Sequence, residues 1–176
     1  MFELYRYTEK EQKQLLDSLK ILIDTREKEN SHIIDYFDKH KIPWEQRSLV
    51  HGDYSFEIPH NDELNIPRDL LFVNRICIER KASLSEWAGN LSQDRQGIKK
   101  KFAVAPANTL LLIENGSYED MVLGKYYGNY SAKSYSASFH SIWNEFNVPI
   151  IFMNNKNYTG MFIYGHFKYY LRNLIK

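Results

Sequence analysis

Short apolar runs alternate along this chain with segments whose apolar residues recur every three or four positions. Runs too short for helices, which we interpret as strands, lie at residues 21–27, 75–81, 109–114 and 148–153, with alternating stretches at 44–49 and 54–58. Helical spacing occurs at residues 8–19, 33–41, 83–102, 131–146 and 159–176. Strands that alternate with helices predict an α/β fold, in which a central mixed β-sheet is flanked by helices on both faces.

Polar residues that can cap helices support two of these boundaries. Thr8 is followed by Glu11, and Ser83 by Glu86, at the spacing of a capping box. In such a box a hydroxyl and a carboxylate bind the free N–H groups of the first helical turn. The first of these helices belongs to residues 1–20, which we interpret as a helical lead-in that serves packing.

A β-hairpin is predicted near the middle of the chain. Residues 44–49 alternate loosely and residues 54–58 strictly, and Gly52 and Asp53 between them have the composition of a tight turn. The segment 59–69 that follows is polar and contains two prolines. We therefore expect it to form a surface excursion within the hairpin.

Length and composition fit a single domain that spans residues 1–176. The chain has 176 residues, of which 43% are hydrophobic and 26% charged, and a domain of this size can bury a core. The formal net charge is only +1, so nucleic-acid binding would depend on local basic patches. The single cysteine, Cys77, excludes an internal disulfide and a cysteine-based zinc site.

The expected location is the cytoplasm. No stretch approaches the length of a membrane-spanning helix, and residues 1–6 lack the pattern of a signal peptide. A single cysteine is compatible with a reducing compartment. The abundance of Lys, Asn, Ile and Tyr suggests an AT-rich bacterial or viral genome. We therefore expect a protein of the bacterial cytoplasm, or of the host cytoplasm if it is viral, without membrane contact.

Charged residues at the end of one strand are the first candidate chemistry. The apolar run at 75–78 ends in Glu79, Arg80 and Lys81. Because side chains alternate along a strand, Glu79 and Lys81 should point to one face and Arg80 to the other. A carboxylate beside an amine suits a divalent metal held by oxygen, next to a group that handles the proton of a water. A surface ion pair at a strand end is the alternative.

Two further charged segments precede this one in the sequence, and the three together resemble the motifs of a known family. Residues 24–27 read Asp-Thr-Arg-Glu at the end of a predicted strand, Gly52-Asp53 come next, and Glu79-Arg80-Lys81 come third. In order and spacing, these motifs resemble those of the XPF-type structure-specific endonucleases, a branch of the restriction-endonuclease-like superfamily. The resemblance covers residues 21–152. It implies the nuclease domain of that family, built on a restriction-endonuclease-like core.

The sequence departs from the family pattern at two points. The aspartate that ends the family's third motif falls on Ser85, and the next residue, Glu86, either replaces it or serves only in the capping box. We expect the protein to lack the helix-hairpin-helix pair that follows the nuclease domain in many relatives. DNA contact is therefore expected from this domain itself or from a DNA-binding partner protein.

The resemblance implies a metal site. Asp53 and Glu79 are the expected ligands, and the backbone carbonyl of Arg80 would join them, as it does in relatives. Oxygen ligands at a partly hydrated site favour Mg²⁺, for which Mn²⁺ can substitute, over zinc. Lys81 would position or deprotonate the attacking water, or offset the charge of the phosphate.

Asp24 is a further catalytic candidate that the resemblance implies. Asp24 and Glu27 resemble extra acidic residues near the metal of the family, and their alternative role is a salt bridge to Arg26 or Arg80. Arg80 itself could contact phosphate or brace the acidic cluster from behind. Arg95 matches an arginine often found on the helix after the third motif, where it would contact phosphate; its alternative is a solvated helix face.

Lysines and tyrosines of the second half are candidates for DNA contact. Cations and stacking faces occur together at Lys99, Lys100, Lys101, Lys125, Lys133, Tyr126, Tyr127, Tyr130 and Tyr135. The tyrosines can equally form a half-buried packing surface. The final helix, residues 159–176, is more apolar than a lone surface helix requires, which suggests contact with a partner subunit, as in a homodimer.

Three functions are compatible with these features. The first, which we predict, is a Mg²⁺- or Mn²⁺-dependent endodeoxyribonuclease acting on branched, flap or single-strand-containing DNA in replication, recombination or repair. The second is a catalytically silent DNA-binding module, which the presence of Asp53, Glu79 and Lys81 argues against. The third is a Holliday-junction resolvase on the same fold, which differs from the first only in the shape of its DNA substrate.

Overall fold

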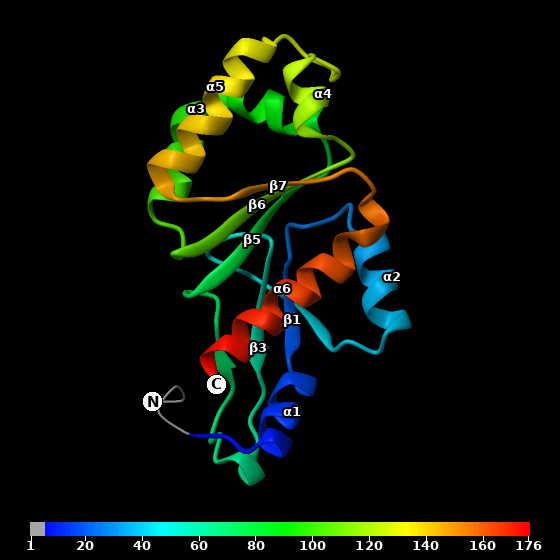
Figure 1. The fold of residues 1–176 in the computed structure, drawn as a ribbon, viewed down its shortest axis with the longest axis vertical. Coiled ribbons are helices and arrows are strands. Elements are labelled where there is room, and N and C mark those ends of the chain that lie inside the picture. The colour runs from blue at the N-terminus through cyan, green and yellow to red at the C-terminus, as the bar shows by residue number, and fades with distance from the viewer. Residues whose placement is uncertain (1–5) are drawn as a thin grey trace.

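The computed structural model describes residues 6–176, which form a mixed sheet with helices on both faces, as predicted (Figure 1). The strands are β1 (Lys20–Asp24), β2 (Trp44–Arg47), β3 (Tyr54–Ile58), β4 (Leu70–Leu71), β5 (Ile76–Lys81), β6 (Asn108–Glu114) and β7 (Ile150–Met153). The α-helices are α1 (Glu9–Asp17), α2 (Ser31–Lys39), α3 (Leu84–Ala103), α4 (Tyr118–Val122), α5 (Ala132–Phe146) and α6 (Thr159–Leu174). Two short 3-10 helices are η2 (Asp62–Leu64) and η3 (Lys156–Tyr158).

The order of the strands brings the charged motifs to one edge of the sheet. The order is β2-β1-β3-β5-β6-β7, with β4 paired to β3. β1 runs parallel to β2, and β5 runs parallel to β6, whereas β3 is antiparallel to both β1 and β5. The ends of β1, β5 and β6 and the start of β3 therefore lie at the same edge.

The predicted hairpin of residues 44–49 and 54–58 is wrong. β2 pairs in parallel with β1, with Ile21 opposite Trp44, and β1 separates β2 from β3. The connection crosses the end of β1, where the N–H of Leu49 donates to Asp24 Oδ2 at 2.8 Å. Alternation of apolar residues gives the period of a strand but not its neighbour, so the sequence pattern does not separate the two arrangements.

The polar segment 59–69 leaves the sheet after β3 and leads through β4 back to β5. Its charged residues Asp62, Glu63 and Asp69 are exposed, as expected of a surface excursion. Leu64 and Ile66 are buried and belong to the hydrophobic core. These two side chains anchor the excursion to the domain.

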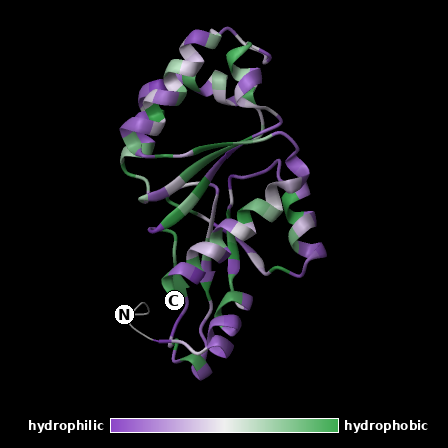
Figure 2. Cartoon of the chain, in the orientation of Figure 1, coloured by the Kyte–Doolittle hydropathy of each residue, from purple (hydrophilic) through white to green (hydrophobic). Residues whose placement is uncertain are grey.

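Two hydrophobic cores, one on each face, hold the helices to the sheet. On one face α1, α2 and α6 pack against β1, β3 and β5, and the ring of Phe167 in α6 lies 5.4 Å from that of Phe56 in β3. On the other face α3, α4 and α5 pack against β6 and β7 around Trp87 and Tyr135. Figure 2 shows the central strands largely in the hydrophobic colour, whereas the outer helices carry hydrophilic residues. The five-residue helix α4 is too short for periodicity to predict.

Helix α3 is interrupted at Asp94, whose φ of −146° and ψ of 63° are not helical. Asp94 Oδ1 accepts a hydrogen bond from the N–H of Gly97 at 2.8 Å, as a capping residue does. The predicted single helix at 83–102 therefore consists of two segments. The second segment carries Lys101, whose side chain reaches Glu79 at the charged edge of the sheet.

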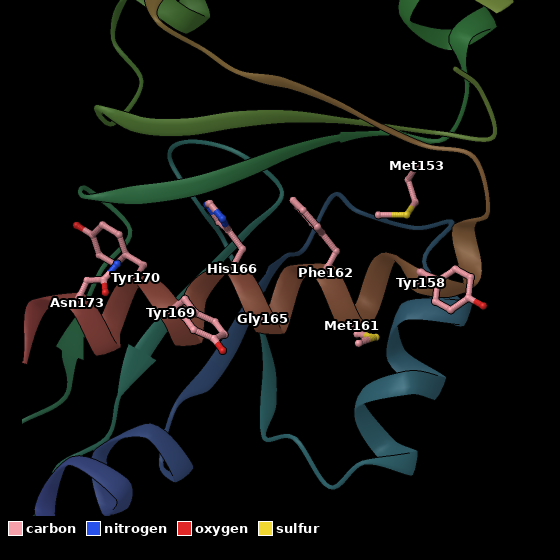
Figure 3. Close-up of a pocket in the computed structure, with 9 residues that line it drawn as sticks. All are labelled: Met153, Tyr158, Met161, Phe162, Gly165, His166, Tyr169, Tyr170 and Asn173. Carbon is pink, nitrogen blue, oxygen red and sulfur yellow. The ribbon is translucent and has the colours of Figure 1, made fainter. Parts of the chain in front are cut away.

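An apolar groove with a volume of about 610 Å³ runs along α6 (Figure 3). Its lining consists of Met153, Tyr158, Met161, Phe162, Gly165, His166, Tyr169, Tyr170 and Asn173. Within the groove His166 stacks on Phe162, and burial lowers the pKa of His166. The predicted apolar surface of the final helix is thus present and open. None of the helices formed by residues 6–176 has the length and apolarity needed to span a bilayer.

Candidate active site

Asp53 lies where three strands meet. Its N–H donates to the carbonyl of Ile78 in β5 at 2.8 Å, and its carbonyl accepts from the N–H of Asp24 in β1 at 2.8 Å. The preceding residue, Gly52, has φ +68°, and a Cβ there would come within 2.8 Å of Cys77 Cβ. Because other residues rarely adopt this conformation and have no space here, glycine is needed to bring Asp53 against β5.

The end of β5 presents charged side chains beside Asp53. Asp53 Oδ2 accepts a hydrogen bond from the backbone N–H of Arg80 at 2.7 Å. Lys81 Nζ lies 3.0 Å from Glu79 Oε1, so these two side chains share one face of β5, as alternation predicts. The charge of Glu79 also acts on Asp53. The side chains of Asp53, Glu79 and Lys81 are therefore neighbours at this edge.

Another cation reaches Glu79 from helix α3. Lys101 Nζ lies 2.6 Å from Glu79 Oε2, the carboxylate oxygen that Lys81 does not occupy. The sequence places Lys101 only among the candidates for DNA contact. Its position in the site depends on how α3 packs against β5, which spacing along the chain does not reveal.

Burial and neighbouring charges shift the pKa values of Asp53 and Glu79 in opposite directions. Burial, and after it the charge of Glu79, raise the pKa of Asp53 to about 7. Burial also opposes ionisation of Glu79, but Lys81 and Lys101 outweigh it and lower the pKa of Glu79. Burial disfavours the charged form of Lys81, yet Glu79 and Asp53 outweigh this effect and raise its pKa. Lys81 is therefore an ammonium at neutral pH.

The donors at this edge fit a hard divalent cation. Asp53 and Glu79 are close enough for one negative charge to disfavour the other, and a bound cation would remove that penalty. Among residues 6–176 no group of three or more His, Cys, Asp or Glu side chains is arranged to hold a metal. A metal would therefore depend on these two carboxylates together with backbone, water or phosphate oxygens, a mixture that suits Mg²⁺.

Asp53→Asn is expected to stabilise the metal-free protein at alkaline pH. The pKa of Asp53 is raised from an ordinary 3.8 to about 7, so this residue contributes stability below the lower value that is lost as pH rises through the upper one. The melting temperature in EDTA should therefore fall less between about pH 5 and about pH 8 in the variant than in the wild type. Glu63→Gln, an exposed carboxylate on η2, is the control. Equal slopes in all three proteins would contradict the raised pKa of Asp53.

Arg80 is buried behind the site in a network of ion pairs. Its Nη1 lies 2.5 Å from Glu27 Oε1, and its Nη2 lies 2.7 Å from Glu114 Oε2 and 3.0 Å from the carbonyl of Glu29. His32 Nε2 in turn lies 2.8 Å from Glu114 Oε1. Only 4% of the Arg80 side chain is exposed, which leaves little access for phosphate. The geometry therefore supports a role for Arg80 in holding the acidic cluster in place from behind, rather than in contacting phosphate.

Glu114 and His32 are absent from the residues that sequence reasoning selects. Glu114 ends an uninterrupted apolar run, much as Glu79 follows one, and this shared feature is a signal that could have identified it. Since β6 is parallel to β5, the end of β6 lies beside the charged end of β5. His32 carries no such signal, because it reaches Glu114 from α2 only through the packing of that helix.

Asp24 is engaged in structural contacts. Its Oδ1 accepts hydrogen bonds from Arg26 Nε at 2.7 Å and from the Arg26 backbone N–H at 2.8 Å, while its Oδ2 binds the N–H of Leu49. Burial opposes ionisation of Asp24, but these hydrogen bonds, those from Arg26 foremost, outweigh it and lower the pKa. The geometry thus supports the salt-bridge alternative for Asp24 and Arg26. A catalytic role for Asp24 stays a prediction.

Glu86 lies in the first turn of α3, whose N-cap is Ser83, and it also faces the site. Its Oε2 accepts from the N–H of Ala82 at 2.7 Å, and its own N–H donates to Ser83 Oγ at 3.1 Å. Its Oε1 lies 3.6 Å from Lys81 Nζ. Only the hydroxyl half of the predicted capping box is thus formed, because the carboxylate of Glu86 binds the N–H of Ala82 instead of that of Ser83. A role for Glu86 in place of the family's aspartate stays a prediction. Ser85, where the family has aspartate, instead accepts a hydrogen bond from a backbone N–H of the segment before α5.

Two hollows adjoin at Lys81. The larger, about 550 Å³, is polar and is lined by Arg26, Glu27, Lys28, Glu29, Asp53, Arg80, Lys81, Ala82, Ser83 and Glu86. The smaller, about 230 Å³, is lined by Glu79, Lys81, Trp87, Asn90, Gln93, Asp94, Ile98, Lys101 and Phe102. Asp53 thus faces the larger hollow, whereas Glu79 and Lys101 face the smaller one. We define the larger hollow as the active-site cleft.

The residues considered for DNA contact differ in exposure. The exposed ones are Arg95, Lys100, Lys101, Lys125, Lys133 and Tyr127. Lys99 is paired with Glu145. The rings of Tyr126 and Tyr135 meet edge to face at 5.1 Å, and Tyr130 also contacts Tyr135, which is fully buried. These three tyrosines therefore form a packing surface, whereas the ring of Tyr127 is exposed. Stacking of Tyr127 on DNA stays a prediction.

Comparisons with known proteins identify a family and a fold for this chain. The model of the family described as the ERCC4 domain matches residues 23–166. Two solved structures, XPF from Aeropyrum pernix and the same protein in complex with DNA, resemble this chain with TM-scores of 0.62 and 0.60, both at 18% identity. The matches cover 86% and 88% of this chain but 61% and 64% of those chains, so this chain spans less than two thirds of their length. No curated protein matches it.

Proposed function

The chain belongs to the family of ERCC4 domains, the XPF-type nuclease domains, and from this membership we propose that it is a metal-dependent DNA endonuclease. The proposed cofactor is Mg²⁺, which Mn²⁺ can replace, and the proposed substrate is branched, flap or single-strand-containing DNA. The proposed setting is replication, recombination or repair in the cytoplasm of a bacterium or of an infected host cell. That one of the similar structures is a complex with DNA supports DNA as the partner.

The meeting of Asp53, Glu79 and Lys81 at one edge carries this proposal. Two carboxylates that disfavour each other's charge stand beside an ammonium 3.0 Å from one of them. Asp53 and Lys81 line the polar cleft of about 550 Å³, and Glu79 and Lys81 line the adjoining hollow. Phosphodiester hydrolysis needs an activated water and positive charge around the phosphate. A cation held by the carboxylates, together with the ammonium, would meet both needs.

The residues around the cleft would have different roles in hydrolysis. A divalent ion bound by Asp53, Glu79 and the carbonyl of Arg80 would supply an activated water and charge neutralisation. Because its pKa is raised, Lys81 holds its proton at neutral pH, and we therefore propose that it offsets phosphate charge rather than abstracting a proton. Glu114 keeps Arg80 in place, and Arg80 in turn holds Asp53 through its backbone N–H.

Cleavage of a panel of labelled DNAs tests the function. Flap, splayed, four-way and linear substrates are incubated with Mg²⁺, with Mn²⁺ or with EDTA, and we expect nicks in the branched substrates only when metal is present. Asp53→Asn should bind these DNAs without cutting them. A strict preference for four-way DNA would favour the resolvase. Binding without any cleavage would favour the catalytically silent module.

We also propose that two copies of the chain pair through the apolar groove along α6. Tyr158, Met161 and Tyr169 of this groove are exposed large side chains, and exposed apolar surface of this extent is typical of an interaction site. Pairing would place two active-site edges in one assembly. A branched DNA could then contact more basic surface than one copy offers.

A further inference from the structure

Both carboxylate oxygens of Glu79 are occupied by lysines that differ in their freedom. Oε1 lies 3.0 Å from Lys81 Nζ, and Oε2 lies 2.6 Å from Lys101 Nζ. The Lys81 side chain is only 14% exposed, whereas that of Lys101 is 47% exposed. Lys81 belongs to the central strand β5, but Lys101 comes from the end of α3. Lys101 therefore has more freedom than Lys81 to leave Glu79 for the solvent.

Only the side chain of Lys101 would have to move. The next residue, Phe102, is buried in the core between α3 and the sheet, which keeps this end of the helix in place. A lysine has a flexible four-carbon stem with a compact charge at its tip. Lys101 also lines the smaller hollow beside Glu79 and Lys81, so rotation of its stem moves the ammonium along the same edge.

We propose that Lys101 is a further active-site residue with two positions. In the metal-free protein its ammonium pairs with Oε2 of the buried Glu79 carboxylate and covers that oxygen. When a divalent cation binds Glu79, Lys101 leaves and contacts a phosphate of the DNA at the same edge. This inference rests on the proposed metal site at Asp53 and Glu79.

The first position predicts that Lys101 competes with metal. Its ammonium both covers one oxygen of Glu79 and repels an approaching cation. Partly exposed ion pairs of this kind are worth little more than a few-fold in an equilibrium constant, so the loss of Lys101 should tighten metal binding about fivefold. This tighter metal binding should be seen without DNA, because no phosphate is then present to pair with Lys101 in place of Glu79.

Mn²⁺ binding to the DNA-free protein, measured by calorimetry or electron paramagnetic resonance, tests this position. Lys101→Gln should bind Mn²⁺ about fivefold more tightly than the wild type. Lys100→Gln, which removes the same charge from an exposed neighbour, should change the affinity less than about twofold. Unchanged or weaker Mn²⁺ binding by Lys101→Gln, next to normal binding by the wild type, would overturn the inference.

A third variant separates failure of this inference from failure of the metal site. Glu79→Gln should lose Mn²⁺ binding. If it binds Mn²⁺ as the wild type does, the proposed metal site itself is wrong and the role of Lys101 falls with it. If Glu79→Gln loses binding but Lys101→Gln equals Lys100→Gln, the metal site stands and only the role of Lys101 is wrong.

The second position is tested with DNA at saturating Mn²⁺. Lys101→Gln should then show a raised KM for DNA and a weaker dependence of DNA affinity on salt, by about one unit of slope, because one phosphate contact is lost. A purely structural lysine would not combine tighter metal binding with weaker DNA binding. A KM and salt slope equal to those of the wild type would overturn the phosphate contact.

Discussion

Glu79→Gln is expected to slow DNA cleavage by about 10³-fold, because metal-dependent stabilisation of a transition state amounts to several kcal/mol and each 1.36 kcal/mol changes a rate about tenfold. Glutamine keeps the size of the side chain but removes the charge that a hard cation requires. DNA binding should persist or strengthen slightly, because a negative charge near the phosphates is lost. Single-turnover cleavage with excess protein, and DNA binding in EDTA, measure the two effects separately.

Glu63→Gln is the matched control for this experiment. It makes the same chemical change on the exposed helix η2 and should cut DNA at the wild-type rate. Thermal unfolding of both variants shows whether each is folded. Cleavage by Glu79→Gln at the rate of Glu63→Gln would mean that the hydrolytic site lies elsewhere in the domain.

Arg80→Met is expected to lower the free energy of unfolding by about 3–5 kcal/mol, the usual effect of removing one partner from a buried ion pair. The reason is that the fully buried Glu114 and the largely buried Glu27 would lose their guanidinium, which now lies 2.7 Å and 2.5 Å from them. Equilibrium unfolding in urea measures the change. Lys99→Met, which breaks the more exposed pair with Glu145, should cost less than about 1 kcal/mol.

A second substitution distinguishes lost charge pairing from lost volume. Adding Glu114→Leu to Arg80→Met removes the buried carboxylate that has lost its guanidinium partner, and apolar replacements of buried ion pairs are often neutral or stabilising. The double variant should therefore recover part of the loss. If Arg80→Met is no less stable than Lys99→Met, the ion-pair network does not hold this edge together.

Arg80 also links stability to function. Its side chain is anchored by Glu114 and Glu27, while its backbone N–H holds Asp53 Oδ2 at 2.7 Å. A side chain locked by packing and ion pairs keeps the neighbouring backbone in one position. We therefore expect that variants which loosen Arg80 also misplace the carboxylate of Asp53.

Local patterns anticipated most of the fold. The apolar periods predicted the long helices and the strands, and the Thr8 capping box is formed as expected. The neighbours of the strands could not be read in the same way. β2 lies against β1 rather than in a hairpin with β3, because strand pairing is decided by contacts between distant segments and not by the period within one segment.

The sequence by itself determined which side chains stand together on one strand. Glu79 and Lys81 share a face of β5 and Arg80 takes the other, since alternation is a property of the extended backbone alone. Only the tertiary structure decided that Lys101 reaches Glu79 and that Glu114 pairs with Arg80. These contacts depend on how a helix and a parallel strand pack beside β5, and packing joins residues whose separation along the chain carries no signal.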